Sequence, residues 1–167
     1  MKHFNFLTHK LTVLFVIFLS LFVFISCETE DDTEILSDVP IIKPITENLF
    51  GTWKSDWDSY IISKDSETVT ITYDDGGWGY GYKADVYGIT DNLIIIKFTE
   101  VGTLEDPNSI NKYSCIFYEN LTSSTVNMAE AYKEGSVLYK STPEEAASEF
   151  TKQNGYYGYP GEYIKNY

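Results

Sequence analysis

The amino-acid sequence predicts an all-β fold, a meander of antiparallel strands with one short C-terminal α-helix. Two observations carry this prediction. From Leu49 onward, short runs of alternating apolar and polar residues are separated by turn residues such as Gly, Asn and Asp. Only one segment, beginning at Thr142, has the start signals of a helix. The alternation fits a closed barrel and an open sandwich equally well, so the pattern alone leaves both open.

The clearest strands lie in the first half of this region. Residues 67–73 alternate Val, Ile and Tyr with Thr, which is typical of a half-buried strand. Asp74-Asp75-Gly76-Gly77 then predicts a turn. A long strand is expected over residues 78–90, with aromatic and aliphatic side chains on one face. Residues 93–98 are almost continuously apolar, which indicates a central strand covered on both faces.

The second half continues the meander. Residues 102–112 predict a longer loop, and residues 111–118 and 125–132 predict a strand pair joined by a turn at 120–124. In the first strand of this pair, Cys115 shares a face with its apolar neighbours, so we expect a buried and inert thiol.

The helix start is defined by local chemistry. Thr142 is the expected N-cap, Pro143 occupies the first helical position, and Glu145 completes a capping box. The helix is expected to end near Gln153, and the last residues of the 156–167 tail, which is too rich in glycine and tyrosine for a helix, are expected to add an edge strand. The side chains expected on the inward face of the helix are Ala146, Ala147 and Phe150.

The N-terminus has the layout of an export signal that ends at Cys27. Lys2 and Lys10 precede an apolar stretch at 11–25, which is shorter than the about 20 apolar residues of a comfortable transmembrane helix. Residues 24–27, Phe-Ile-Ser-Cys, resemble the cleavage box of bacterial lipoproteins, although Phe stands where Leu is commonest. The resemblance implies that Cys27 is lipidated, with palmitate or similar acyl chains, and becomes the new N-terminus.

This resemblance sets the expected organisation and location. Residues 1–26 are the signal peptide, 27–47 an acidic, proline-containing tether, and 48–167 a β-barrel-like domain. The lipid on Cys27 would anchor the protein to a membrane of the bacterial cell envelope, with the outer membrane favoured. The alternatives are ordinary cleavage, or an uncleaved anchor helix in which Cys27 is incidental.

Residues 49–53, Leu-Phe-Gly-Thr-Trp, resemble the Gly-x-Trp opening of lipocalin-like barrels. The wider layout is similar to the small lipocalin-like domains of bacterial lipoproteins, and to uncharacterised lipoproteins of spirochaetes such as Treponema, over roughly residues 49–160. The resemblance implies a small closed lipocalin-like barrel with one late helix. It also implies that Trp53 lies on the first strand and plugs one end. It brings no assigned function.

Composition excludes several function classes. The formal net charge is −13, which should repel nucleic acid. Both histidines, His3 and His9, lie in the expected signal peptide, and all twelve basic residues are lysines. A mature chain without imidazole excludes catalysis by a histidine base and His-ligated metal sites. We therefore expect no enzyme, no cofactor and no metal, and a monomer.

Aromatic residues supply the candidate binding surfaces, because exposed tyrosine offers contact area with a polar tip. The candidates lie in two glycine-spaced patches: Trp78, Tyr80 and Tyr82, and Tyr156, Tyr157 and Tyr159. The first patch could equally line the barrel interior. The leading hypothesis is a binding module that holds a small apolar ligand inside the barrel. The alternative is a surface interaction protein or adhesin that contacts glycans or host proteins through these patches.

Carboxylates allow two further interpretations. Asp56 and Asp58 flank Trp57 at strand spacing, and glycosidases use paired carboxylates, but acidic pairs are common on a surface this acidic. Residues 74–77 lack the ordered spacing of a calcium loop, so a plain turn is favoured there.

Overall fold

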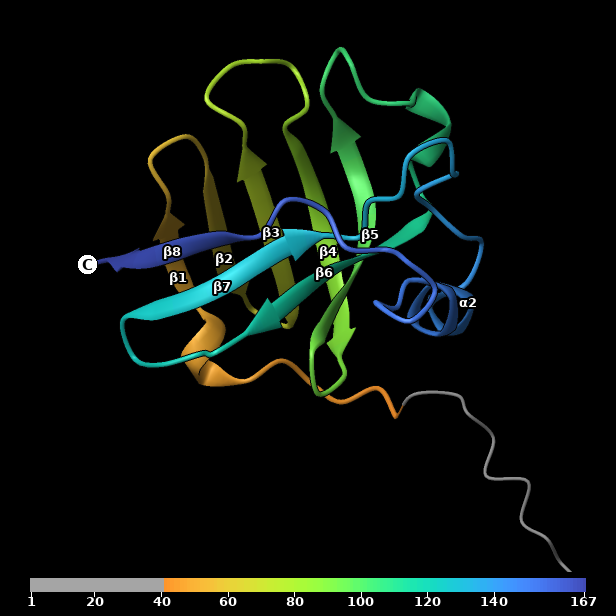
Figure 1. Cartoon of the computed structure of the whole chain (residues 1–167). Helices are drawn as coiled ribbons and strands as arrows, with labels where there is room; N and C mark the ends of the chain where they lie inside the picture. The colour runs from red at the N-terminus through yellow and green to blue at the C-terminus, as the bar shows by residue number, and fades with distance from the viewer. Residues whose placement is uncertain (1–40) are drawn as a thin grey trace, which may run out of the picture. The chain divides into compact units, whose positions relative to one another are not determined.

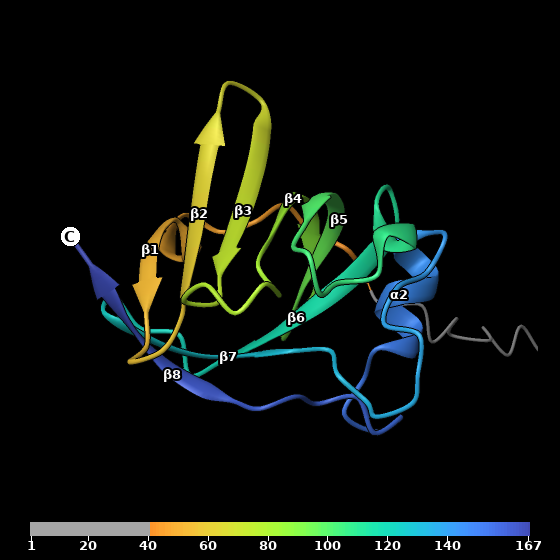
Figure 2. The ribbon, with the colours of Figure 1, turned by 90° about the horizontal axis from the view of Figure 1, so that it is seen from above.

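The computed structural model describes residues 41–167. The predicted signal peptide, most of the tether and Cys27 lie outside the described residues. The described chain forms a closed barrel in which each of eight strands is antiparallel to the next and the last pairs with the first (Figures 1 and 2). The predicted all-β barrel with one short helix is confirmed, and closure of the sheet rules out the open sandwich. Strand number and order are those of lipocalin-like barrels.

The strands are β1 (Gly51–Lys54), β2 (Ser59–Asp65), β3 (Thr68–Asp74), β4 (Tyr82–Ile89), β5 (Leu93–Val101), β6 (Tyr113–Glu119), β7 (Thr125–Glu130) and β8 (Gly161–Asn166). Between β7 and β8 lies the helix α2 (Pro143–Glu149), and two 3-10 turns, η1 (Glu47–Leu49) and η2 (Pro107–Ser109), lie before β1 and before β6.

One end of the barrel is closed by apolar side chains. Trp53 on β1 is fully buried, and its indole N–H donates to the carbonyl oxygen of Leu49 in η1 at 2.8 Å. Aliphatic side chains from the inward positions of the strands pack with Trp53 in the interior, as period-two alternation requires. They include Ile62, Ile71, Ile94, Ile96, Ile116 and Met128. We call this the closed end.

A second apolar layer lies outside the barrel, where α2 packs on β5 and β6. Residues 93–98 are apolar at every position but one because Ile94 and Ile96 face the interior, whereas Leu93 and Ile95 face the helix layer. The expected strand covered on both faces is confirmed. Cys115 also lies in this layer, buried as predicted.

The helix begins as predicted and ends earlier. Thr142 accepts from the backbone N–H of Glu145, whose carboxylate accepts in turn from the N–H of Thr142. The end expected near Gln153 is wrong, because Phe150 leaves the helical conformation and packs its ring against Tyr156.

The long strand predicted from Trp78 is also wrong, because β4 begins only at Tyr82. The carboxylate of Asp75 accepts from the backbone N–H groups of Gly77, Trp78 and Tyr80, and so holds this segment as a loop. Gly77 and Gly79 support the loop with φ angles of 93° and 99°.

The C-terminal strand is not the expected edge strand. β8 pairs with β7 on one side and with β1 on the other, and this pairing closes the barrel. The predicted β6 and β7 also differ at their ends, since they span 113–119 and 125–130 rather than 111–118 and 125–132.

The chain joins the barrel at the closed end. Lys43 and Ile89 exchange two backbone hydrogen bonds of 2.7 Å, and the Lys43 ammonium lies 2.9 Å from the carboxylate of Asp91. The last residues of the predicted tether therefore contact the barrel. The β1–β2, β3–β4 and β5–β6 loops lie together at the opposite end, along the top of Figure 1. We call that end the mouth.

Candidate functional site

Large aromatic side chains project from the mouth into solvent. Trp57 in the β1–β2 loop is 82% exposed, Trp78 in the β3–β4 loop 75%, and Tyr159, just before β8, 90%. Tyr80 is half exposed beside Trp78. Three separate connections thus supply exposed rings to one end of the barrel, and such clustering marks a contact surface more often than scattered exposed residues do.

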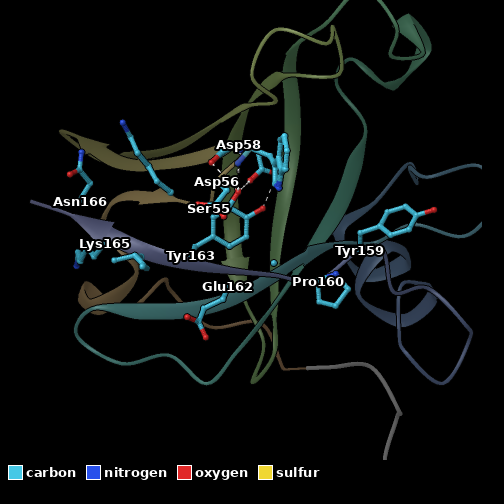
Figure 3. Close-up of a pocket in the computed structure, with 13 residues that line it drawn as sticks. Ser55, Asp56, Asp58, Tyr159, Pro160, Glu162, Tyr163, Lys165 and Asn166 are labelled. Atoms are coloured by element: carbon cyan, nitrogen blue, oxygen red, sulfur yellow. Dashed lines mark hydrogen bonds between the residues drawn. The ribbon is translucent and has the colours of Figure 1, made fainter.

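A groove of about 700 Å³ opens where β1 and β8 separate (Figure 3). The last pair between these strands is Lys54 with Ile164, although β8 begins three residues earlier at Gly161. The chain turns away from β8 after Lys54, because the Ser55 hydroxyl accepts from the backbone N–H groups of Trp57 and Asp58 at 3.1 Å. We call the opening, lined by residues 54–58 and 159–166, the seam groove.

The seam groove exposes part of a strand edge. The backbone N–H of Lys165 donates to Ser124, on the β7 side of β8. Because backbone groups alternate sides along a strand, those of Glu162 point the other way, toward β1. β1 has ended at this level, so the N–H and C=O of Glu162 face the seam groove.

The groove combines aromatic walls with polar groups. Figure 3 shows Asp56 and Asp58 on one side, with Tyr163 directed toward Asp58, and Tyr159 at the opposite end from Lys165 and Asn166. Trp57 and Tyr159 supply flat apolar faces, whereas the carboxylates, the Asn166 amide and the backbone of Glu162 supply hydrogen-bonding groups. Such a surface suits a ligand with both flat apolar faces and many hydroxyl or amide groups.

Four tyrosines ring the interior just inside the mouth: Tyr60, Tyr73, Tyr82 and Tyr163. Successive ring centroids are 5.2 Å apart between Tyr163 and Tyr60, 4.7 Å between Tyr60 and Tyr73, and 5.4 Å between Tyr73 and Tyr82. We call this set, which comes from β8, β2, β3 and β4, the tyrosine girdle.

Asp58 connects the girdle to the seam groove. Its carboxylate lines the groove and accepts from the hydroxyls of Tyr73 and Tyr163, each at 2.9 Å, and from the Ser55 hydroxyl. Burial, together with nearby carboxylates, raises the pKa of both tyrosines, so they remain protonated donors at neutral pH. The position of Asp58 in the groove therefore depends on the girdle.

Glu130, at the end of β7, is the carboxylate at the inner side of the girdle. Val126, Met128 and Glu130 alternate inward along β7, which directs a charged side chain into the barrel. Burial raises the pKa of Glu130 to about 7, and the charges of Glu105 and Asp58 act in the same direction. Glu130 is thus partly protonated near neutral pH.

The residues predicted as binding candidates are divided among three environments. Tyr82 lies in the girdle, whereas Trp78, Tyr80 and Tyr159 lie on the mouth surface. Tyr156 is buried against Phe150 beside α2, and Tyr157 packs its ring edge-on against Phe117. Only Tyr159, of the predicted candidates, lines the seam groove.

Sequence reasoning missed the side chains that build the site. In the sequence Trp57 stands out only as the residue between two aspartates, and no local pattern marks Tyr60 or Tyr163 as part of a site. The alternation over residues 125–132 carried a usable signal, because it directs Glu130 to the same face as Val126 and Met128.

Within residues 41–167, no group of three histidine, cysteine or acidic side chains could hold a metal ion. The described chain also contains no helix with the length and apolar character needed to span a membrane. No family model, no curated protein and no solved structure matches the sequence.

Proposed function

We propose that this protein is a lipid-anchored bacterial envelope protein that binds a glycan in the seam groove, without catalysis. The observation that carries the proposal is the pair of exposed rings, Trp57 and Tyr159, that flank a groove lined with hydrogen-bonding groups.

The chemistry of the groove favours a sugar. A pyranose ring has apolar C–H faces that stack on aromatic rings, and hydroxyls that need acceptors and donors around its rim. Asp56 and Asn166 offer a carboxylate and an amide, and the backbone of Glu162 adds one donor and one acceptor. Leaving Trp57 and Tyr159 in water is unfavourable unless a ligand covers them.

The interior of the barrel is a weaker candidate for the ligand. The inward positions of the strands are occupied by side chains of low exposure, from Trp53 at the closed end to the tyrosine girdle at the mouth. A small apolar ligand inside the barrel would have to displace them. We therefore place the ligand at the mouth.

The direction of the chain supports a role at an envelope surface. The described chain reaches the barrel at the closed end, through the Lys43 and Ile89 hydrogen bonds, and the mouth lies at the other end (Figure 1). If Cys27 is lipidated, the protein is attached to the membrane through the closed end, and the mouth stays accessible to ligands.

Binding is tested with an array of neutral and acidic oligosaccharides, followed by calorimetric titration of the best binder. Trp57→Ala and Tyr159→Ala should each weaken binding at least about tenfold, as expected for loss of a stacking ring worth about 1.4 kcal/mol or more. Tyr87→Ala is the matched control, because Tyr87 is another solvent-exposed aromatic residue but lies on the outer wall of β4, away from the groove. Binding that resists both groove variants, or binding of host proteins with no glycan among the array hits, would overturn the proposal.

The anchor is tested separately by intact-mass analysis of the protein purified from its own membranes. We expect acyl chains on an N-terminal Cys27, and release of Cys27→Ser from the membrane fraction. An unacylated Cys27 in the membrane-derived protein would contradict the anchor while leaving the groove proposal standing.

A further inference from the structure

Two polar atoms at the mouth are sealed from solvent without a hydrogen bond: the hydroxyl oxygen of Tyr82 and Oε1 of Glu130. The two side chains are close enough that each affects the pKa of the other. Buried polar atoms almost always have a partner, because an unsatisfied one costs about 1–3 kcal/mol. This pair of unsatisfied atoms therefore makes the packing of the mouth energetically unfavourable.

The surroundings of Glu130 favour its neutral form. Neutral hydroxyls face it from four strands, and the charged groups that affect it most are two carboxylates in separate loops. These six residues are Tyr60 of β2, Tyr73 of β3, Tyr82 of β4, Tyr163 of β8, Asp58 of the β1–β2 loop and Glu105 of the β5–β6 loop. The hydroxyls of Tyr82 and Tyr60 favour the ionised form, but burial outweighs them, and an ionised Glu130 needs water or a cation at its sealed oxygen, Oε1.

The effect of ionisation reaches the seam groove through Asp58. Asp58 is held by Tyr73 and Tyr163, which belong to the girdle that encloses Glu130. Water that enters to solvate the sealed Oε1 of an ionised Glu130 has to pass girdle rings that lie in contact, which loosens the girdle. Repulsion between the carboxylates of Glu130, Glu105 and Asp58 acts in the same direction, since it pushes the two loops outward.

We propose that Glu130 is a proton-binding site that controls the mouth of the barrel. With a proton on Glu130 the girdle is closed, Asp58 is fixed, and the seam groove has its described shape. Without the proton the girdle opens to water, the β1–β2 loop and the start of β8 loosen, and the groove loses affinity for its ligand. The ligand part of this statement rests on the proposed function, whereas the opening of the mouth does not.

The pKa of Glu130, raised to about 7 by burial, places the change within the neutral range rather than at acid pH. The girdle tyrosines do not titrate there, because burial raises the pKa of Tyr60, Tyr73, Tyr82 and Tyr163 further from neutrality.

The experiment uses the ligand-free protein and needs no knowledge of the ligand. Amide hydrogen exchange is followed by mass spectrometry from about pH 5.5 to about pH 8.5, with rates corrected for the intrinsic effect of pH. Protection of residues 55–58 and 159–163 should fall at least about tenfold across this range, as a free-energy change of about 1.4 kcal/mol or more requires.

Three variants test whether ionisation of Glu130 causes the pH dependence of the protection. Glu130→Gln should abolish the pH dependence and keep the segments protected throughout. Tyr82→Phe should move the midpoint to higher pH, because the Tyr82 hydroxyl lowers the pKa of Glu130. Glu105→Gln should move the midpoint to lower pH, because the charge of Glu105 raises that pKa.

The proposal fails if protection is independent of pH in the unmodified protein, or if Glu130→Gln keeps the dependence. Shifts of the midpoint in the same direction for Tyr82→Phe and Glu105→Gln would also overturn it. A protein that shows these shifts but binds no oligosaccharide would refute the glycan proposal alone, so the two failures are distinguishable.

Discussion

At the closed end of the barrel, Trp53 is fully buried and its indole N–H is satisfied by the carbonyl of Leu49. At the mouth, Tyr82 is buried and Glu130 is partly buried, but each has a polar atom that is sealed from solvent without a partner. At one end of the barrel, therefore, the buried indole N–H has a hydrogen-bond partner. At the other end, a titratable carboxyl group and a tyrosine hydroxyl each keep a sealed oxygen without one.

The comparison shows how a small domain separates stability from binding. Burial of apolar surface, the main stabilising contribution, comes from the barrel interior and from the layer beneath α2. The mouth contains the exposed rings and the tyrosine girdle, where buried polar groups cost stability but can respond to a ligand or to pH. The following variants test this division, from the largest expected effect to the smallest.

Trp53→Ala should be the most damaging change. It removes the largest side chain of the closed end and leaves a cavity, so we expect the free energy of unfolding to fall by about 3–5 kcal/mol. Urea unfolding at neutral pH provides the measurement. Trp57→Ala at the mouth is the matched control, with an expected change within about 0.5 kcal/mol. Equal losses from the two variants would break the comparison, because they would make the mouth as important for stability as the closed end.

Glu130→Gln should stabilise the protein, and only above acid pH. The pKa of Glu130 rises from 4.5 to about 7 on folding, so the native state binds the proton more tightly and the unmodified protein loses stability as pH rises through this window. At about pH 8 the variant should be more stable by about 2–3 kcal/mol, and near pH 4.5 by little. Urea unfolding at both pH values decides. Glu162→Gln, at an exposed carboxylate, should show no such gain; a loss of stability at pH 8 for Glu130→Gln would mean that the buried charge is favourable.

Tyr163→Phe should weaken the mouth by a smaller amount. It removes one of the donors to the Asp58 carboxylate, and a hydrogen bond to a charged group contributes about 1–2 kcal/mol. Thermal unfolding measures the loss. Tyr87→Phe is the control, because Tyr87 is exposed and outside the girdle. An unchanged melting temperature for Tyr163→Phe would show that Asp58 is not fixed by the girdle.

Asp75→Asn should have the smallest global effect, below about 1 kcal/mol, because Asp75 organises only an exposed loop. Its local effect should be clear. Burial opposes ionisation of Asp75, but the backbone N–H donors together outweigh it and lower the pKa, so the carboxylate is charged at neutral pH. Faster amide exchange at residues 76–81, with unchanged exchange at the closed end, is the expected result. Slower exchange at residues 76–81, or a matching change at the closed end, would contradict it.

Local chemistry was predictable from the sequence. The capping box at Thr142 requires only residues 142–145, and the burial of both faces of residues 93–98 follows from their unbroken apolar character. The all-β class followed from alternation and turn residues, which are also local.

Features that depend on distant residues were not predictable. Alternation over 78–82 cannot reveal that Asp75 holds the segment as a loop, and composition cannot reveal that β8 meets β1. The girdle gathers residues from β2, β3, β4 and β8, so no short window contains it. Glu130 was visible as an inward charge, but its raised pKa comes from neighbours far along the chain.

Because Cys115 is buried beneath α2, its reactivity can report the undocking of this helix. Its thiol lies beneath α2 in the outer apolar layer, and burial raises its pKa well above the usual range, so thiol reagents cannot reach a reactive thiolate while the helix is docked. The rate of alkylation at Cys115 therefore measures how often α2 lifts from β5 and β6. Because that layer lies outside the barrel, the measurement can follow the helix separately from the mouth, without any added label in the native chain.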